Sequence, residues 1–243
     1  MKIVIMTDVH GNLPALRAAL RVIRREGYDV IYHTGDAIGI GPYPAEALDV
    51  LLSTPRIVML MGNHEARFVE GLPQQPPQGM SEMAFEHNHW VHSVLEPALR
   101  PVVARWPYCL RASFDGLRVT FIHYGLEGTD WTFAPVVQEP TPADLDRIFG
   151  GYTSDLVFYG HHHPASDITG RARYVNPGSL GCFQKPLARF AVLEIAAHGG
   201  YTLEKRAVPY DNTDLLQELT RRRVPARDYI YRAFFGVDPA DFA

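Results

Sequence analysis

The stretch KIVIMTDVHGNLPALRAALRVIRREG, residues 2–27, decides the fold, because it joins a short apolar run to an amphipathic helical pattern. The apolar run ends at Asp8, and leucines and an isoleucine then recur at the three- and four-residue spacing of a helix. Asn12 is a favourable helix N-cap, Pro14 suits the first turn and Gly27 is a typical helix end. The stretch therefore predicts a strand followed by a helix.

Four further short runs rich in β-branched residues have the same character as the first. They are VIYHTGD (30–36), RIVMLMG (56–62), LRVTFIH (117–123) and DLVFYGH (155–161). Continuous apolar runs of this length are typical of strands buried on both faces. A second helical pattern at 43–53 separates the second run from the third, and this alternation of strands and helices predicts an α/β fold.

The remaining chain predicts additions to this core. A loop rich in Pro, Gln and Gly is followed by a long helical stretch over roughly 80–105, and an Asp-Gly turn at 115–116 joins two strands of a hairpin. Three later strands and two short helices complete the chain. We therefore expect one domain over 1–243, with a helical cap insertion over about 66–110 and a C-terminal helical tail over about 212–235.

Composition excludes several classes of protein. Hydrophobic residues make up 47% of the 243 residues and the net charge is −4, so nothing indicates the clustered positive charge of a general nucleic-acid surface. No run reaches the roughly 20 apolar residues of a membrane helix, and the first apolar run lacks a signal-peptide cleavage region. With only Cys109 and Cys182, a disulfide scaffold is ruled out. We expect a cytoplasmic protein without membrane contact and leave its oligomeric state open.

Polar residues with metal-binding side chains follow all five apolar runs. They are Asp8 and His10, Asp36, the triplet Asn63, His64 and Glu65, then His123, and finally His161 to His163. Open α/β sheets bind ligands beyond the carboxyl ends of their strands, so residues far apart in the sequence can converge there. Carboxylates and imidazoles together suit divalent metals such as Mn, Fe and Zn. Taken singly, each residue is more often a turn, cap or core residue, but five such strand ends in one chain predict a shared metal site.

The spacing within two of these groups predicts which side chains point the same way. Side chains two residues apart on an extended chain face the same side. Asp8 and His10 should therefore point together, and so should His161 and His163, with His162 turned the other way. We expect the outer two histidines of the GHHHP segment to be ligands.

The order of these motifs resembles that of the calcineurin-like metallophosphoesterase superfamily. Its blocks D-x-H, G-D, G-N-H-[DE], H and G-H-x-H all occur here, between residues 8 and 163. The phrases DVHGNLPALRAAL (8–20), GDAIGIGPYPAEALDVL (35–51) and VNPGSLG (175–181) resemble its small bacterial phosphodiesterase branch. The resemblance implies a four-layer αββα sandwich with two divalent metals at its edge. Manganese is the expected metal, with iron, zinc and nickel as alternatives.

The resemblance also implies a role for each residue of the site. One metal would be held by Asp8, His10 and His163, and the other by Asn63, His123 and His161, with Asp36 bridging both. His64 would be catalytic, meeting the substrate and helping the leaving oxygen depart. The implied reaction is in-line attack of a metal-bridging hydroxide on the phosphorus of a small phosphoester, because two metals clamp both oxygens of such a displacement.

Two departures from the family pattern refine this expectation. Phosphoprotein phosphatases of the superfamily carry an extra Asp and Arg after the G-D block, and GDAIGIG has neither, which argues against that activity and favours diesters. The fourth block reads HYG, so Tyr124 either lines the pocket or is a packed aromatic. We expect a phosphodiesterase. A phosphomonoesterase and a dinucleoside polyphosphate hydrolase are the alternative enzymes, and a non-catalytic scaffold with this fold is the alternative of another class.

Two more stretches carry metal-type residues that the family pattern does not use. FEHNHWVH places His87, His89 and His92 in the expected insertion, without the carboxylate–histidine signature of a metal site. We therefore favour a cap that contributes to substrate selection over a third metal site. Cys182 follows GSLG close to the expected site, but no general base pairs with it, and we do not assign it as a nucleophile.

Overall fold

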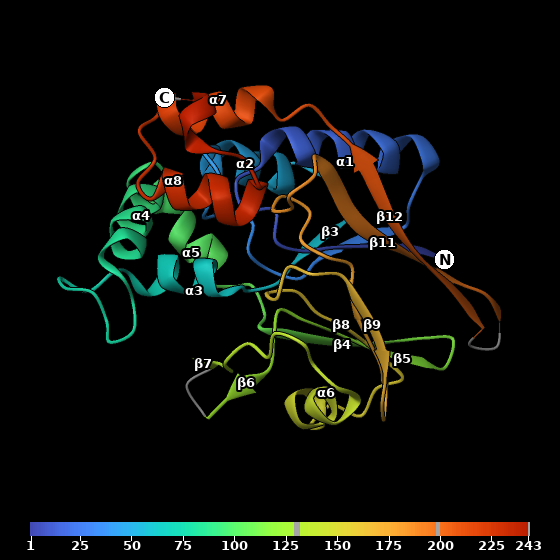
Figure 1. Cartoon of the computed structure of the whole chain (residues 1–243). Coiled ribbons are helices and arrows are strands. Elements are labelled where there is room, and N and C mark those ends of the chain that lie inside the picture. Colours follow the sequence, from blue (N-terminus) through green and yellow to red (C-terminus); the bar gives the residue numbers. More distant parts are fainter. Residues whose placement is uncertain (129–131, 198–199, 243) are drawn as a thin grey trace.

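Two five-stranded mixed sheets lie face to face, with helices on their outer surfaces (Figure 1). The computed structural model describes residues 1–128, 132–197 and 200–242. The first sheet has the order β12-β11-β1-β2-β3, and the second has the order β4-β5-β8-β10-β9. Helices α1 and α2 cover the outer face of the first sheet, and α6 covers that of the second. The four-layer αββα sandwich predicted from the sequence is confirmed.

The first sheet is parallel at its centre and antiparallel at one edge. β1 and β2 pair in parallel, with Ile3 opposite Val30, whereas β11 runs antiparallel to β1 and to β12. Its strands are β1 (Lys2–Met6), β2 (Val30–His33), β3 (Ile57–Met59), β11 (Leu187–Ile195) and β12 (Tyr201–Pro209). Alternate residues of β1 face opposite layers, since Ile3 and Ile5 pack between the sheets while Val4 and Met6 pack under the helices. Burial on both faces explains the unbroken apolar run.

The second sheet contains the predicted hairpin. Its strands are β4 (Cys109–Phe114), β5 (Leu117–Ile122), β8 (Leu156–Phe158), β9 (Ser166–Thr169) and β10 (Arg173–Asn176). Phe114 pairs with Leu117 across the turn, and Asp115 and Gly116 both have positive φ, as a two-residue hairpin turn of this hand requires. Two short strands, β6 (Leu126–Glu127) and β7 (Thr132–Phe133), pair separately.

The helices follow the sequence signals at some places and not at others. They are α1 (Leu13–Glu26), α2 (Pro44–Leu52), α3 (Asn63–Glu70), α4 (Glu82–Ser93), η1 (Pro97–Leu99), α5 (Arg100–Val103), α6 (Pro142–Phe149), α7 (Thr213–Arg221) and α8 (Arg227–Ile230). Asn12 caps α1 as predicted, its side chain accepting from the N–H of Ala15 at 3.0 Å. The stretch predicted as one helix over 80–105 is broken, because prolines interrupt it after α4.

The predicted insertion and tail lie beside each other at one end of the sandwich (Figure 1). His87 of α4 joins them, since its ring bonds to the carbonyl of Pro225 at 3.1 Å and accepts from the N–H of Ile40 at 2.9 Å. The segment after α8 continues as a wide turn over Tyr231–Phe235 and a short helix over Pro239–Phe242. In the described part of the chain, no helix has both the length and the apolar character that a bilayer crossing demands.

Candidate metal centre

The loops that follow β1, β2, β3, β5 and β8 meet at one edge of the sandwich. Backbone hydrogen bonds hold the first two loops together, from the N–H of Asp8 to the carbonyl of Gly35 and from the N–H of His10 to that of Asp36, each at 3.0 Å. The side chains of Asp8, His10, Asp36 and His123 are almost completely buried there. The structure thus brings together residues from five separate strand ends.

The side chains converge for a reason other than the predicted one. The strands end before the ligand residues, β1 at Met6 and β8 at Phe158. Positive φ angles then mark Asp8, His10, Asp36, His161 and His163. The assumption of an extended chain with alternating sides was therefore wrong at both D-x-H and GHHHP. Left-handed backbone is costly for residues other than glycine and clusters at functional sites.

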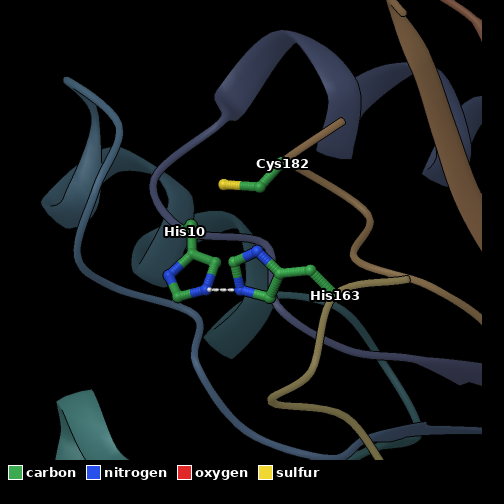
Figure 2. A group of neighbouring side chains, drawn as sticks. All are labelled: His10, His163 and Cys182. Carbon is green, nitrogen blue, oxygen red and sulfur yellow. Dashed lines mark hydrogen bonds between the residues drawn. The ribbon is translucent and has the colours of Figure 1, made fainter. Parts of the chain in front are cut away.

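One group of side chains centres on His10. Its Nε2 lies 2.9 Å from Nε2 of His163 (Figure 2) and 3.6 Å from Oδ1 of Asp8. Its Nδ1 donates to the carbonyl of Ile38 at 3.1 Å, so Nε2 is the nitrogen that faces these neighbours and carries the lone pair once the ring is deprotonated. Thr7 donates its hydroxyl to Asp8 at 2.8 Å and fixes that carboxylate.

A second group centres on His123, and Asp36 lies between the two groups. Oδ2 of Asp36 is 3.2 Å from Nε2 of His123 and 3.7 Å from Nε2 of His10. Nδ1 of His123 donates to the carbonyl of Thr34 at 3.0 Å, which again directs Nε2 into the site. This position of Asp36 is the one that a bridging carboxylate requires.

The amide of Asn63 tests whether this arrangement fits a cation. Its Oδ1 lies 2.7 Å from Nδ1 of His161, 3.1 Å from Nε2 of His123 and 3.2 Å from Oδ2 of Asp36. A flipped amide satisfies these contacts without an ion, because its N–H group then donates to Nδ1 of His161 and to Oδ2 of Asp36. These two acceptors converge on one point, and they can face a cation in place of the N–H group. Borderline nitrogen and oxygen ligands of this kind suit first-row divalent metals. The residues present therefore fit a metal centre.

The electrostatics of the site also favour positive charge. Burial opposes protonation of His123, but the carboxylate of Asp36 outweighs it and raises the pKa of His123 to about 9. Burial likewise opposes ionisation of Asp36, yet the surrounding histidines, His123 foremost, hold its pKa well below the usual range. The carboxylates thus stay ionised and attract a cation.

His64 is the first-turn residue of α3 that faces this site. Its backbone N–H donates to Oδ1 of Asp36 at 3.0 Å, and its ring meets that of His10 edge-on with centroids 5.1 Å apart. Gly39 makes room for the ring, since a Cβ there would lie 2.4 Å from Nδ1 of His64. Burial lowers the pKa of His64 well below its ordinary value, so the ring is neutral near pH 7. A ring nitrogen also lies within 4.8 Å of the ligand atoms of His10 and Asp36.

Residues 1–187 match the family model of calcineurin-like phosphoesterases. The chain belongs to this family. An uncharacterised protein of Methanocaldococcus jannaschii is 26% identical over 164 residues, which are 66% of this chain and 62% of that protein. This chain therefore spans less than two thirds of that relative.

Solved structures match this chain in fold. A hypothetical protein of Pyrococcus horikoshii OT3 superposes with a TM-score of 0.79 at 18% identity, covering 98% of this chain and 99% of that one. A metallophosphoesterase of Sphaerobacter thermophilus superposes with a TM-score of 0.67 at 22% identity, covering 93% and 95%. Together with the family match, these results confirm the resemblance and the fold predicted from the motifs.

The structure gathers all seven side chains expected to hold metal, and their binding of metal stays a prediction. His162, between two of them, belongs to none of the potential ligand groups found in the described part of the chain. Tyr124 is buried against Phe149, and its hydroxyl accepts from the N–H of Val137 at 3.2 Å, as expected of a packed aromatic. Its ring also meets that of His161, with centroids 5.2 Å apart, so it packs against a predicted ligand.

Glu65 is a positioning residue that the sequence reasoning left without a role. Its buried carboxylate accepts from the N–H groups of Asp36, Ala37 and Ile38 at 2.7, 2.9 and 3.1 Å and from that of Gly62 at 3.0 Å. It therefore fixes the loop that carries Asp36. The sequence contained only half of a signal, because a glutamate three residues after a helix N-cap belongs to a capping box, but glycine at the N-cap has no side chain to complete it.

Cys182 lies close to the site without facing its centre. Its sulfur is within 4.8 Å of ligand nitrogens of His10 and His163. Figure 2 shows the sulfur on the other side of the two rings from their Nε2 contact. Burial raises the pKa of the thiol well above its ordinary value, so the side chain is a packed thiol and not an activated nucleophile.

The three histidines of α4 do not form a metal tract in the described residues. His87 is buried and bonded to the backbone at both nitrogens. His89 and His92 instead meet the rings of Phe85 and Phe68 edge-on. A contribution of this helix to substrate selection stays a prediction.

Proposed function

We propose that the chain is a phosphodiesterase that holds two divalent metal ions, and manganese is the expected metal. The observation that carries this proposal is the position of Asp36, whose Oδ2 lies 3.2 Å from His123 and 3.7 Å from His10, between two groups of potential ligands. Membership of the calcineurin-like phosphoesterase family supports phosphoester hydrolysis. When bound, two such metals supply charge neutralisation and an activated water.

The proposed ligand sets follow the two groups of side chains. Asp8, His10 and His163 would hold one metal, Asn63, His123 and His161 the other, and Asp36 both. Backbone carbonyls behind His10 and His123 fix which ring nitrogen faces the metal, and such outer partners orient ligands before metal arrives. Glu65 keeps the Asp36 loop in place.

His64 is the residue proposed to act on the leaving oxygen. Its neutral ring has an N–H that can donate to a phosphate oxygen, and the negative charge of a bound substrate raises its pKa toward proton transfer. Gly39 and the start of α3 hold it beside the metal groups. We assign it to catalysis and not to metal binding. Because its ring nitrogen lies within 4.8 Å of a ligand nitrogen of His10, the metal content of a His64 variant tests this assignment.

Two observations support a diester over a monoester. The GDAIGIG segment lacks the Asp and Arg of the phosphoprotein phosphatases. A cavity of about 940 Å³ adjoins His64 and offers room for an ester arm. A non-catalytic scaffold needs neither the complete set of potential ligands nor the placed imidazole of His64.

The test compares a diester and a monoester of the same nitrophenol with the manganese-loaded chain. We expect a higher kcat/KM for the diester. A tenfold preference for the monoester, about 1.4 kcal/mol in the transition state, would overturn the diester assignment.

Asp36→Asn should lower turnover by orders of magnitude and reduce bound metal, whereas Asp49→Asn, on the exposed side of α2, should change neither. Full metal loading with no turnover of any phosphoester would favour the scaffold.

A further inference from the structure

A large cavity opens beside the metal centre, between the insertion and the C-terminal segment. Its volume is about 940 Å³. Its walls come from α3, the loop that follows it, α4, and residues 226–234 of the tail, which Figure 1 shows next to α4. Cavities of this size hold small-molecule ligands.

The cavity is continuous with the site. His64 lines it while its ring contacts that of His10, and Phe234 lines it while its ring centroid lies 5.6 Å from that of His163. A molecule whose phosphate occupies the metal centre can therefore extend between His64 and Phe234 into the cavity.

Apolar side chains dominate the walls. They include Ile40, Met80, Met83, Tyr229, Ile230 and Phe234. Met83 is 52% exposed and Tyr229 57% exposed, although both are large. Exposed apolar side chains that gather around a cavity indicate a binding surface for an apolar group.

Arg67 of α3 places a cation at the inner end of this cavity. Its Nη1 lies 3.0 Å from the amide of Asn63. In the amide orientation that satisfies its neighbours, the oxygen of Asn63 accepts from Nη1 of Arg67, and this contact holds the guanidinium beside the candidate metal centre. No carboxylate of the described residues lies within 4.0 Å of its guanidinium. A guanidinium without a carboxylate partner keeps donors for an anion, and its planar arrangement of N–H groups suits a phosphate.

The charges of the cavity limit what the rest of the ligand can be. Arg67 is the one Lys or Arg among its described lining residues, and Glu70, one turn later in α3, adds a negative charge. A polyphosphate chain needs several cations, so these walls disfavour a dinucleoside polyphosphate. An uncharged arm fits them.

We propose that Arg67 binds the phosphoryl group of the substrate and that the adjoining cavity holds a large, uncharged, apolar ester arm. The proposal rests on the proposed function, since it names the substrate class of the same site. It also supplies, from α3, the arginine that the segment after Asp36 lacks.

The first experiment measures phosphate binding without turnover. Inorganic phosphate is titrated calorimetrically into the manganese-loaded wild type and Arg67→Gln. We expect at least tenfold weaker binding in the variant at unchanged manganese content, partial recovery in Arg67→Lys, and no change in Arg111→Gln, an exposed arginine of β4. Equal affinities in wild type and Arg67→Gln would overturn the role of Arg67.

The second experiment measures the preference for an apolar arm. Methylphosphonate and naphthylmethylphosphonate carry the same charged head and differ in the arm. The wild type should bind the naphthyl compound at least tenfold more tightly. Ala84→Trp, which fills the cavity from an exposed position of α4, should remove this difference, and Ala84→Ser should preserve it.

The outcomes separate this inference from the proposed function. Absence of turnover on every phosphoester, with metal bound, would refute the phosphodiesterase but leave the phosphonate comparison intact. Equal affinity of the wild type for both phosphonates would refute the apolar-arm subsite even if diesters are hydrolysed.

Discussion

The Nε2 atoms of His10 and His163 lie 2.9 Å apart, although 153 residues separate them in the sequence. Neither position is part of a strand, and both residues have positive φ. The carbonyl of Ile38 orients one ring, and the carbonyl of His163 in turn accepts from the N–H of Ser179 at 2.9 Å. Two imidazoles held this close by the backbone match one half of the metal site proposed above.

Separate alanine substitutions in the GHHHP segment should give two inactive proteins and one active one. His161→Ala and His163→Ala should each lose bound metal and most activity, because their ring nitrogens face the two ligand groups. His162→Ala is the matched control and should keep both. Elemental analysis of the metal content of each variant tests this prediction. Loss of metal in the His162 variant alone would show that His162, and not its neighbours, is the ligand.

His64→Ala should reduce hydrolysis of a diester with a poor leaving group far more than that of a nitrophenyl diester. An alkoxide needs a proton as it departs, whereas a nitrophenolate does not. Metal content should not change, and His89→Ala, exposed on α4, serves as the control. Equal losses on both substrates would exclude the acid role, and loss of metal would make His64 a ligand.

Metal binding should release protons near neutral pH. Asp36 raises the pKa of His123 to about 9 against the opposing effect of burial, so this ring is protonated in the metal-free protein and must lose its proton to bind. Apparent affinity should therefore increase about tenfold per pH unit below pH 9. Calorimetry in buffers of different ionisation enthalpy measures the released protons. His123→Gln should release about one proton fewer, and an unchanged count would contradict the prediction.

The metal-free protein should lose stability between pH 6.5 and pH 4, in part through His87. Burial lowers the pKa of this ring to about 4. The unfolded chain therefore takes up the proton below about pH 6.5, and the folded chain only below about pH 4, so the free energy of unfolding falls as pH falls through this window. The pKa difference of His87 between the folded and unfolded chain contributes about 3 kcal/mol to this change in the free energy of unfolding. Urea unfolding of His87→Gln should show a shallower pH dependence than the wild type, while exposed His89→Gln should match the wild type.

Much of the fold was predictable because it depends on local patterns. Strands buried on both faces leave unbroken apolar runs, as in β1, and Asn12 and Gly27 mark both ends of α1. Helix α3 was missed because it begins directly at the GNHE block, where Gly62 offers no capping side chain. Its start is instead stabilised by Glu65, which only the folded loop reveals as an acceptor for distant N–H groups.

The candidate site was predictable in membership but not in geometry. Residue types after each strand end indicated which side chains would meet, because parallel strands end at the same edge. Left-handed backbone at Asp8 and His161 could not be read from the residue types, since tertiary hydrogen bonds between loops impose it. Arg67 escaped notice for the same reason. Its proximity to Asn63 depends on the unpredicted turns of α3.

Apart from Ile40, the cavity beside His64 is lined by residues 64–88 and 226–234, and the second of these stretches is beyond the part of the chain that matches the family. Neither stretch contains a predicted metal ligand. Mutations in α4 or in the tail can therefore reshape the cavity while the buried centre stays intact. On the proposed function, the residues that choose the substrate are therefore different from those that hold the metal, and substitutions in the cavity walls can change specificity without removing a proposed ligand.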